Sequence, residues 1–366
     1  MIGRKRRAGL LAPFAITLIA AVKPPPVELI AVPPPQMEPE VPPLDEPTKA
    51  DYPTPPAFIA ERISRDRFDP GEFEYLRGYF PEASKEEHDR YAELIAWLDQ
   101  CWKEGDDRLA AVMAEFDVTL NGDEFSGAAS LCQQVVYGKD WIRRFDSYAE
   151  LAEAARGARL VFDAMNQTAE EASFTEAPRF YRHIWDEINY FDLQHYLLSR
   201  ASSWGETEFF NPERRPRLTE DERVVFAALL AAEYVRVQFA RTRWLEEVVE
   251  RHGWPTVSKV GQIGASKAGL LVAFGDHDPG FQLRMLRVME SEVASGTLDG
   301  FEFAEIHDAV MLKLTGKQRY GTHTRCNADG TAEPMPLEHP ENVNEWRARI
   351  GLEPLTPSGE EAYYGC

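Results

Sequence analysis

The stretch "TEDERVVFAALLAAEYVRVQFARTRWLEEVVERHG", residues 219–253, predicts one long helix with defined ends. Thr219, with Glu222 three positions later, forms the capping-box pattern of a helix start. Gly253, followed by Trp254 and Pro255, is a typical helix stop. Between these ends apolar residues recur at helical spacing: Val225, Leu229, Ala232, Phe239 and Val248. We therefore expect a helix that is buried along one side over this whole stretch.

Helical patterns extend on both sides of this stretch. Upstream, three-four apolar spacing predicts helices over 86–116, 145–168 and 178–200. Downstream, we expect helices over 266–275, from Asp278 to about Gly296, from about 303 to Gly316, and over 341–350. Two short strands, Tyr320–Cys326 and Thr331–Leu337, flank a predicted turn. The fold class is therefore mainly α, a helical bundle-like body with a short C-terminal β-hairpin.

The N-terminal part has a different composition. Residues 1–22 carry four cations and then a fifteen-residue apolar run, the pattern of a secretory signal. A cleaved signal peptide and a retained signal anchor both stay open, and each places the body outside the cytoplasm, in the periplasm or another extracytoplasmic space. Residues 23–57 form a Pro-rich tether, since thirteen of the 26 prolines lie between Pro24 and Pro56. Fully extended, the tether would reach about 100 Å.

These boundaries predict four parts. They are a signal segment (1–22), the tether (23–57), an N-terminal helical region (58–218) and a C-terminal helical domain with the hairpin (219–366). The 366-residue chain has 44% hydrophobic residues, enough for a sizeable core. Its net charge of −21 excludes general electrostatic binding of nucleic acid. Any anionic partner therefore needs a local basic patch.

The four cysteines fall two in each half of the chain. Cys101 and Cys132 lie in the N-terminal half, and Cys326 and Cys366 lie in the C-terminal half. Export would allow disulfides, and one bridge in each half is the simplest pairing. None of the four has CxxC spacing, which argues against a cysteine zinc site or a thioredoxin-type centre.

An ordered set of motifs runs from about Glu233 to Leu355. The set is His252-Gly253-Trp254-Pro255, Ser258, Val260-Gly261, Asp276-His277-Asp278, Phe281-Gln282, Asp308, Gln318-Arg319-Tyr320-Gly321-Thr322-His323 and Gly351-Leu352-Glu353-Pro354-Leu355. In this order the motifs resemble an uncharacterised bacterial domain family. The chain departs from that family at Ala273-Phe274, where members commonly have Gln-His, and at His323, where they commonly have Gln. The resemblance implies a shared domain over about a third of the chain, and it implies no activity.

Acidic residues and histidines suggest metal sites, each with a simpler explanation. Asp276 and Asp278, with Asp308, could offer oxygen ligands to a hard cation. In the simpler interpretation Asp278 caps a helix, Asp276 faces the same helix dipole and His277 faces water. Asp192 and His195 lie one helical turn apart, and we prefer a buried imidazole oriented by Asp192. No HExxH motif is present, and we expect no metal or other cofactor.

The stretch "GKQRYGTH", residues 316–323, has six polar or charged side chains in eight positions. From Ala309 to Ala328 the sequence has no acidic residue and four cations: Lys313, Lys317, Arg319 and Arg325. The helix dipole accounts for Lys313 and Lys317. It does not account for the hydrogen-bonding residues Gln318, Tyr320, Thr322 and His323. A loop that recognises a carboxylate or phosphate, and a structural tie between the hairpin and the helices, both stay open.

Two functions follow from this loop. The first is a binding or protein-interaction module that recognises a small anionic or peptide ligand. Its ligand-binding residues would be Trp254, Ser258, Gln318, Arg319, Tyr320, Gly321 and Thr322, with Asp308 nearby. The alternative is a hydrolase-like enzyme in which His323 or Asp308 acts as base and Arg319 or Lys317 stabilises negative charge. Whether the protein is an enzyme stays open, and a membrane partner is expected only through an uncleaved N-terminus.

Overall fold

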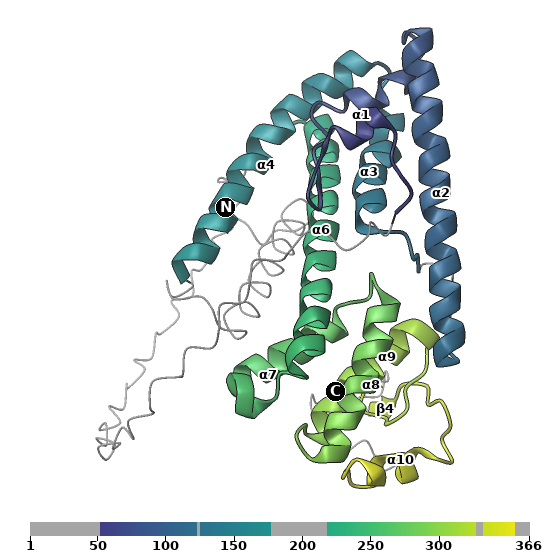
Figure 1. Ribbon diagram of the computed structural model, residues 1–366, viewed down its shortest axis with the longest axis vertical. Helices are drawn as coiled ribbons and strands as arrows, with labels where there is room; N and C mark the ends of the chain where they lie inside the picture. The colour runs from purple at the N-terminus through teal and green to yellow at the C-terminus, as the bar shows by residue number, and fades with distance from the viewer. Residues whose placement is uncertain (1–51, 123–124, 177–217, 327–331, 356–366) are drawn as a thin grey trace, which may run out of the picture. The chain divides into compact units, whose positions relative to one another are not determined.

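A computed structural model describes residues 52–122, 125–176, 218–326 and 332–355 (Figure 1). The signal segment, most of the tether, the predicted helix 178–200 with Asp192 and His195, and the predicted turn 327–330 lie outside the described residues. The domain boundary expected at residue 218 stays a prediction, because residues 177–217 lie outside them as well. The described residues fall within one compact unit that runs from Pro42 to Cys366.

Helices dominate the described part of the chain. They are α1 (Ala57–Ala60), α2 (Lys85–Phe116), α3 (Ser130–Trp141), α4 (Tyr148–Glu176), α6 (Glu220–His252), α7 (Val257–Ala273), α8 (Pro279–Ser295), α9 (Gly300–Thr315) and α10 (Val343–Arg349), with 3-10 turns η1 (Glu74–Tyr79) and η2 (Ile142–Arg144). Two antiparallel pairs complete the list, β1 (Ile63–Ser64) with β2 (Arg67–Phe68), and β3 (Thr324–Cys326) with β4 (Ala332–Pro334). The predicted mainly α fold with a C-terminal hairpin is confirmed.

Helix α6 has the ends that its sequence predicts. The Thr219 hydroxyl accepts a hydrogen bond from the Glu222 amide at 3.2 Å, and the Glu222 carboxylate accepts one from the Thr219 amide at 2.6 Å. These two bonds satisfy backbone donors that the first turn of a helix leaves open. At the other end Gly253 adopts a φ of 70°, which a residue with a side chain rarely adopts. The helix is 33 residues long, about 50 Å at 1.5 Å per residue.

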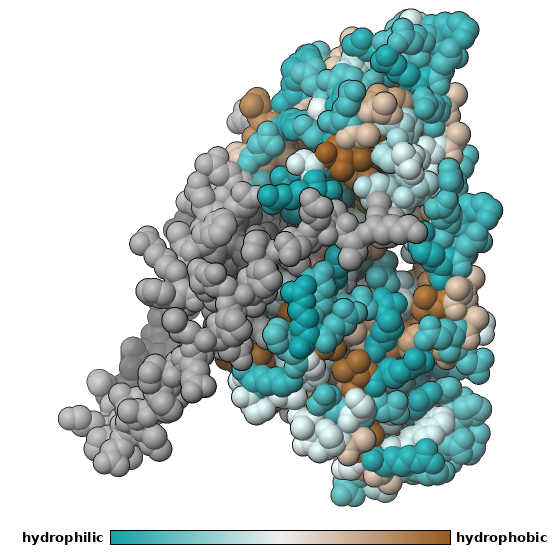
Figure 2. All heavy atoms as spheres, in the orientation of Figure 1, coloured by the Kyte–Doolittle hydropathy of each residue, from teal (hydrophilic) through white to brown (hydrophobic). Residues whose placement is uncertain are grey.

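The length of α6 lets it contribute to two hydrophobic clusters. The first cluster collects buried residues of η1, α2, α3, α4 and the first half of α6, and the second collects buried residues of α7, α8, α9 and the second half of α6. Helices α3 and α4 pack against α6, while α7 and α8 pack against α9 (Figure 1). On the face shown in Figure 2, hydrophilic residues cover most of the described surface and apolar residues show in small, separate areas.

A disulfide joins α2 to α3 within the first cluster. Cys101 and Cys132 are both buried, and their Cα atoms lie 6.1 Å apart. This confirms the pairing expected for the N-terminal half. The pairing expected for the C-terminal half involves Cys366, which lies outside the described residues.

Several elements differ from their predicted bounds or were not predicted. Helix α7 begins at Val257 and not at 266, because Thr256 starts a first turn that continues past a break at Gly261 (φ 75°, ψ 168°). Strands β3 and β4 are shorter than expected, since the backbone amides of Tyr320 and Thr322 donate to Asp308 on α9 instead of pairing in the hairpin. Helix α3 was not predicted, because its short apolar run has no clear periodicity. Among the described helices, none is both long and apolar enough to span a bilayer.

Candidate functional site

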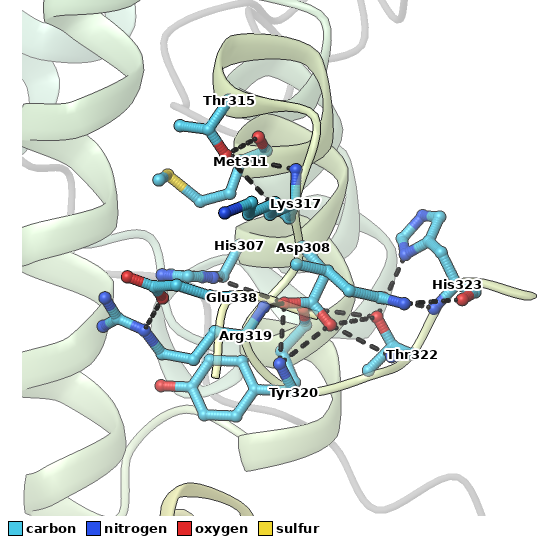
Figure 3. A network of polar contacts seen from close by, with 12 residues as sticks. His307, Asp308, Met311, Thr315, Lys317, Arg319, Tyr320, Thr322, His323 and Glu338 are labelled. Carbon is cyan, nitrogen blue, oxygen red and sulfur yellow. Dashed lines mark hydrogen bonds and ion pairs between the residues drawn. The ribbon is translucent and has the colours of Figure 1, made fainter. Parts of the chain in front are cut away.

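The loop between α9 and β3, residues 316–323, turns back onto the helix that precedes it (Figure 3). Gly316 ends α9 in the left-handed conformation, with a φ of 73°. Gly321 also has a φ of 73°, and a Cβ atom there would lie 2.9 Å from the side chain of Leu355. Both glycines therefore hold positions that a larger residue would strain.

Asp308 organises this loop from the inner side of α9. Its side chain is fully buried and accepts hydrogen bonds from the backbone amides of Arg319 (2.9 Å), Tyr320 (3.0 Å) and Thr322 (3.0 Å). The Thr322 hydroxyl donates a fourth bond at 2.9 Å. Dashed lines in Figure 3 converge on this carboxylate from the loop. Both carboxylate oxygens are therefore committed to the loop.

These bonds favour the ionised form of Asp308. Burial alone would raise the pKa of Asp308, but hydrogen bonds from His307, Thr322 and Tyr320 outweigh burial and lower the pKa below its ordinary value of 3.8. A general base works best when its pKa lies near the working pH. Asp308 is therefore suited to anchoring the loop and poorly suited to acting as a base at neutral pH.

Gln318 joins the loop to the hairpin. Its buried amide nitrogen donates to the carbonyls of His323 (2.8 Å) and Met335 (2.9 Å), and its amide oxygen accepts from the His323 backbone at 2.9 Å. Its own backbone pairs with Pro336 and Glu338. The Gln318 side chain is fully occupied in this way, which favours the structural tie over direct contact with a ligand.

Tyr320 packs its ring into the second cluster. The ring lies edge-on to Phe303 and His307, at centroid distances of 5.8 and 5.1 Å. Burial raises the pKa of its hydroxyl to about 12. The Tyr320 carbonyl accepts a bond from the buried guanidinium of Arg347 at 2.8 Å. His307 is also buried, one turn after Phe303 on α9.

Arg319 and His323 leave the loop in different directions. The Arg319 guanidinium pairs with Glu338 at 3.0 Å and lies 5.2 Å from the ring centre of Trp346. In Figure 3 the side chains of Arg319 and His323 lie on opposite sides of the Asp308 carboxylate. The structure therefore does not bring these two predicted site residues together.

Thr322 connects His323 to Asp308. The single hydroxyl proton of Thr322 goes to the Asp308 carboxylate at 2.9 Å, so the same hydroxyl must accept from His323 Nδ1, 3.0 Å away. This network assigns the proton of a neutral His323 to Nδ1. Nε2 then keeps its lone pair and is free to accept a proton or a hydrogen bond.

The cations of this region mostly have carboxylate partners from elsewhere in the chain. Lys313 pairs with Asp276 at 3.2 Å, Arg319 pairs with Glu338, and Arg325 pairs with Glu333 on the opposite strand. The absence of acidic residues along the sequence therefore does not produce an equally basic patch in space. Lys317 is exposed at the start of the loop.

Two further predicted ligand residues lie on the segment between α6 and α7. Trp254 is fully buried in the second cluster, and Ser258 is exposed, with its hydroxyl 3.0 Å from that of Thr256. Within the part of the chain that the structure describes, no hydrogen bond joins either residue to residues 318–323. Their role as ligand residues stays a prediction.

The Asp276-His277-Asp278 turn follows the simpler interpretation at Asp278. Asp278 caps α8 by accepting from the Phe281 amide at 2.9 Å, and Asp276 pairs with Lys313. His277 does not point to water as expected. Its Nε2 lies 3.2 Å from the Thr242 hydroxyl of α6, and burial and Arg241 lower its pKa to about 3. The described residues contain no group of three side chains placed to hold a metal ion.

Arg347 and Glu338 both bond to residues of the loop, and the sequence did not predict either contact. Arg347 is buried and holds the carbonyls of Tyr320 and Glu353, at 2.8 and 2.6 Å. The one available signal was its position four residues after the apolar Val343, on the inner face of α10. Glu338 gave no signal in the sequence.

Comparison with known proteins finds a similar family for the C-terminal part of the chain. Residues 212–363 match the model of a family of unknown function, DUF6624. Neither the curated proteins nor the solved structures gave a match. The matched region contains the stretch from Glu233 to Leu355, in line with the domain that the sequence predicts. The C-terminal region, from α6 to α10, is therefore similar to a domain family with no established function.

Proposed function

We propose that the protein is an exported binding or protein-interaction module whose ligand site lies beside the loop 316–323. The observation that carries the proposal is the loop's own bonding, because Asp308 and Gln318 fix it in one conformation. A surface that is ordered before binding loses less entropy when it takes a ligand. The loop then offers the half-buried His323 ring and the exposed Lys317 ammonium to a ligand.

The chemistry of this surface favours a peptide over a simple anion. Three of the four neighbouring cations already have carboxylate partners, which weakens attraction for phosphate. His323 Nε2 is an acceptor in the neutral ring and would take a peptide N–H. Lys317 could pair with a carboxylate of the same class of ligand.

A titration of the full chain tests this proposal. We expect a tripeptide such as trialanine to shift the His323 ring nitrogen signals in NMR, and inorganic phosphate to leave them unchanged. His323→Gln should abolish peptide binding. The matched control is His339→Gln, because His339 is exposed and, like His323, hydrogen-bonded to a neighbour, in its case Glu341 at 3.1 Å. Equal responses of both histidines, or a response to phosphate alone, would contradict the proposal.

The second candidate is a hydrolase-like enzyme that uses His323 as base. The linked side chains His323, Thr322 and Asp308 favour it, because a hydroxyl and a buried carboxylate orient the ring and leave Nε2 available. Hydrolysis of p-nitrophenyl acetate that is lost in His323→Gln, reduced in Thr322→Val and kept in His339→Gln would favour the enzyme. Equal hydrolysis by all four proteins would remove this candidate.

The same proposal includes export of the protein from the cytoplasm. The signal pattern of residues 1–22 and the buried disulfide between Cys101 and Cys132 support it, because disulfides persist in oxidising compartments. The intact mass of the protein from a periplasmic fraction tests it. Recovery in the cytoplasm with both thiols reduced would contradict export, and loss of residues 1–22 would distinguish a cleaved signal from an anchor.

A further inference from the structure

The outward face of α7 is apolar. Ile263, Leu270 and Phe274 follow one another at intervals of seven and four residues, which places them on one stripe of the helix. Their side chains are 62%, 43% and 45% exposed. Apolar residues gathered on one exposed face, unlike single scattered ones, mark an interaction surface.

The inner face of α7 has an unusual share of small residues. Gly264, Ala265, Ala268 and Gly269 are buried beside Leu271 and Val272. A Cβ atom at Gly269 would lie 2.4 Å from the side chain of Ile306 on α9, so the two helices approach closely there. A helix that served only the core would bury its larger apolar side chains. In α7, Ile263 and Leu270 are exposed, as is Phe274 at its C-cap, while the glycines and alanines share the inner face with Leu271 and Val272.

The charge around α7 also differs from that of the rest of the chain. From Arg251 to Gly275 the sequence has no acidic residue, and its cations are Arg251, Lys259 and Lys267. The Lys313 ammonium of α9 lies 5.7 Å from the ring centre of Phe274. The chain as a whole carries a charge of −21. Arg251 pairs with Glu247 and Lys313 pairs with Asp276, so the net positive charge of this apolar face comes from Lys259 and Lys267 of α7.

We infer that α7 is a membrane-surface contact that takes the anionic headgroup layer of a bilayer. An interfacial helix combines exposed apolar side chains with neighbouring cations that attract anionic lipid. Helix α7, with 17 residues and a break at Gly261, is suited to lying in the interface and not to crossing the bilayer. The site is separate from the proposed ligand site and does not depend on it.

Two features favour a bilayer over a second copy of the chain. Helix α7 carries Lys259 and Lys267 and no acidic residue, so an anionic headgroup layer would meet a locally positive face, whereas a second copy would bring the same positive helix against it. The predicted N-terminal segment and its tether, with a reach of about 100 Å, would also keep the body close to the membrane. The neighbouring carboxylate Asp276 is paired with Lys313. Glu302 of α9 approaches α7 on its inner side, and burial raises its pKa.

The test must report on α7 itself, since the N-terminal segment of the full chain could also bind lipid. Ser266 lies on the outward face between Ile263 and Leu270 and is exposed. A fluorophore on Ser266→Cys, attached without reducing the native disulfide, would be exposed to vesicles that contain brominated lipid. The vesicles would be phosphatidylcholine alone or an equal mixture with phosphatidylglycerol. Ala92→Cys, on the exposed side of α2, provides the matched control.

We expect quenching at position 266 only with the anionic vesicles, and none at position 92. Adding Ile263→Ser and Leu270→Ser should reduce the quenching to the level of the control, with an unchanged circular dichroism spectrum. Equal quenching at both positions, or equal quenching with both kinds of vesicle, would overturn the inference. A change at position 266 without lipid that grows with protein concentration would assign the face to a second copy, and it would overturn the inference too.

Discussion

The loop 316–323 and helix α7 use their side chains in opposite ways. The loop is rich in polar residues, and Gln318, Tyr320 and their anchor Asp308 are buried. Helix α7 is rich in apolar residues, and Ile263, Leu270 and Phe274 are exposed. A stretch that is rich in polar and charged residues is therefore not necessarily the part of the surface that contacts a partner. In this protein, the polar motif holds the loop in place, and helix α7 has the larger exposed apolar surface.

The largest expected effect comes from removing the anchor of the loop. Asp308→Ala leaves three backbone amides and the Thr322 hydroxyl without their acceptor, and should lower the free energy of unfolding by about 4 kcal/mol. Urea unfolding followed by circular dichroism measures this loss. The matched control is Asp276→Ala, a partly exposed carboxylate paired with Lys313, which should cost at most about 1 kcal/mol. Equal losses in the two variants would show that Asp308 does not organise the loop.

Removing the tie to the hairpin should have the next largest effect. Gln318→Ala removes three hydrogen bonds in a buried setting, and we expect a loss of about 2 kcal/mol. The His323 amide, which donates to this side chain, should exchange with solvent faster. Gln100→Ala serves as control, because the Gln100 amide bonds to Glu104 on the exposed face of α2. That variant should change stability by less than about 0.5 kcal/mol.

Acid should remove part of the stabilisation that Asp308 provides. The folded pKa of Asp308 lies below its ordinary value of 3.8, so its ionised form stabilises the protein above that pH. The contribution is lost as the pH falls through the folded pKa. The difference in unfolding free energy between the wild type and Asp308→Asn should therefore be constant near neutral pH and shrink under acid conditions. A difference that stays constant throughout would contradict a lowered pKa.

The sequence predicted those parts of the fold that local patterns specify. The capping box at Thr219, the stop at Gly253 and the Asp278 cap of α8 all formed, because each depends on residues within one turn. The pairing of Cys101 with Cys132 was predicted because each half of the chain has two cysteines. Helix α3 and the early start of α7 were missed, since one has no clear period and the other contains a glycine break.

The candidate site was less predictable, because its contacts join residues that are far apart in the chain. The importance of residues 316–323 was visible, but the direction of each side chain was not. Asp308 reaches Thr322 across fourteen positions, and Arg347 reaches Tyr320 across 27. Likewise, the carboxylate partners of Lys313 and Arg319 lie outside residues 309–328, the segment without acidic residues. A charge pattern along the sequence therefore overstated the basic character of the folded surface.

Two adjacent leucines of α7 provide a direct test of the comparison, and the change at the exposed one has a small expected effect. Leu270 is 43% exposed and Leu271 is 3% exposed, so the same change to alanine should have different consequences. Leu271→Ala should cost about 2 to 5 kcal/mol, because it leaves a cavity in the second cluster. Leu270→Ala should cost less than about 1 kcal/mol, since most of what it removes already faces solvent. Chemical unfolding of both variants, without lipid, measures the difference. Similar losses would mean that the outward face of α7 is part of the core, and the contrast with the loop would then fail.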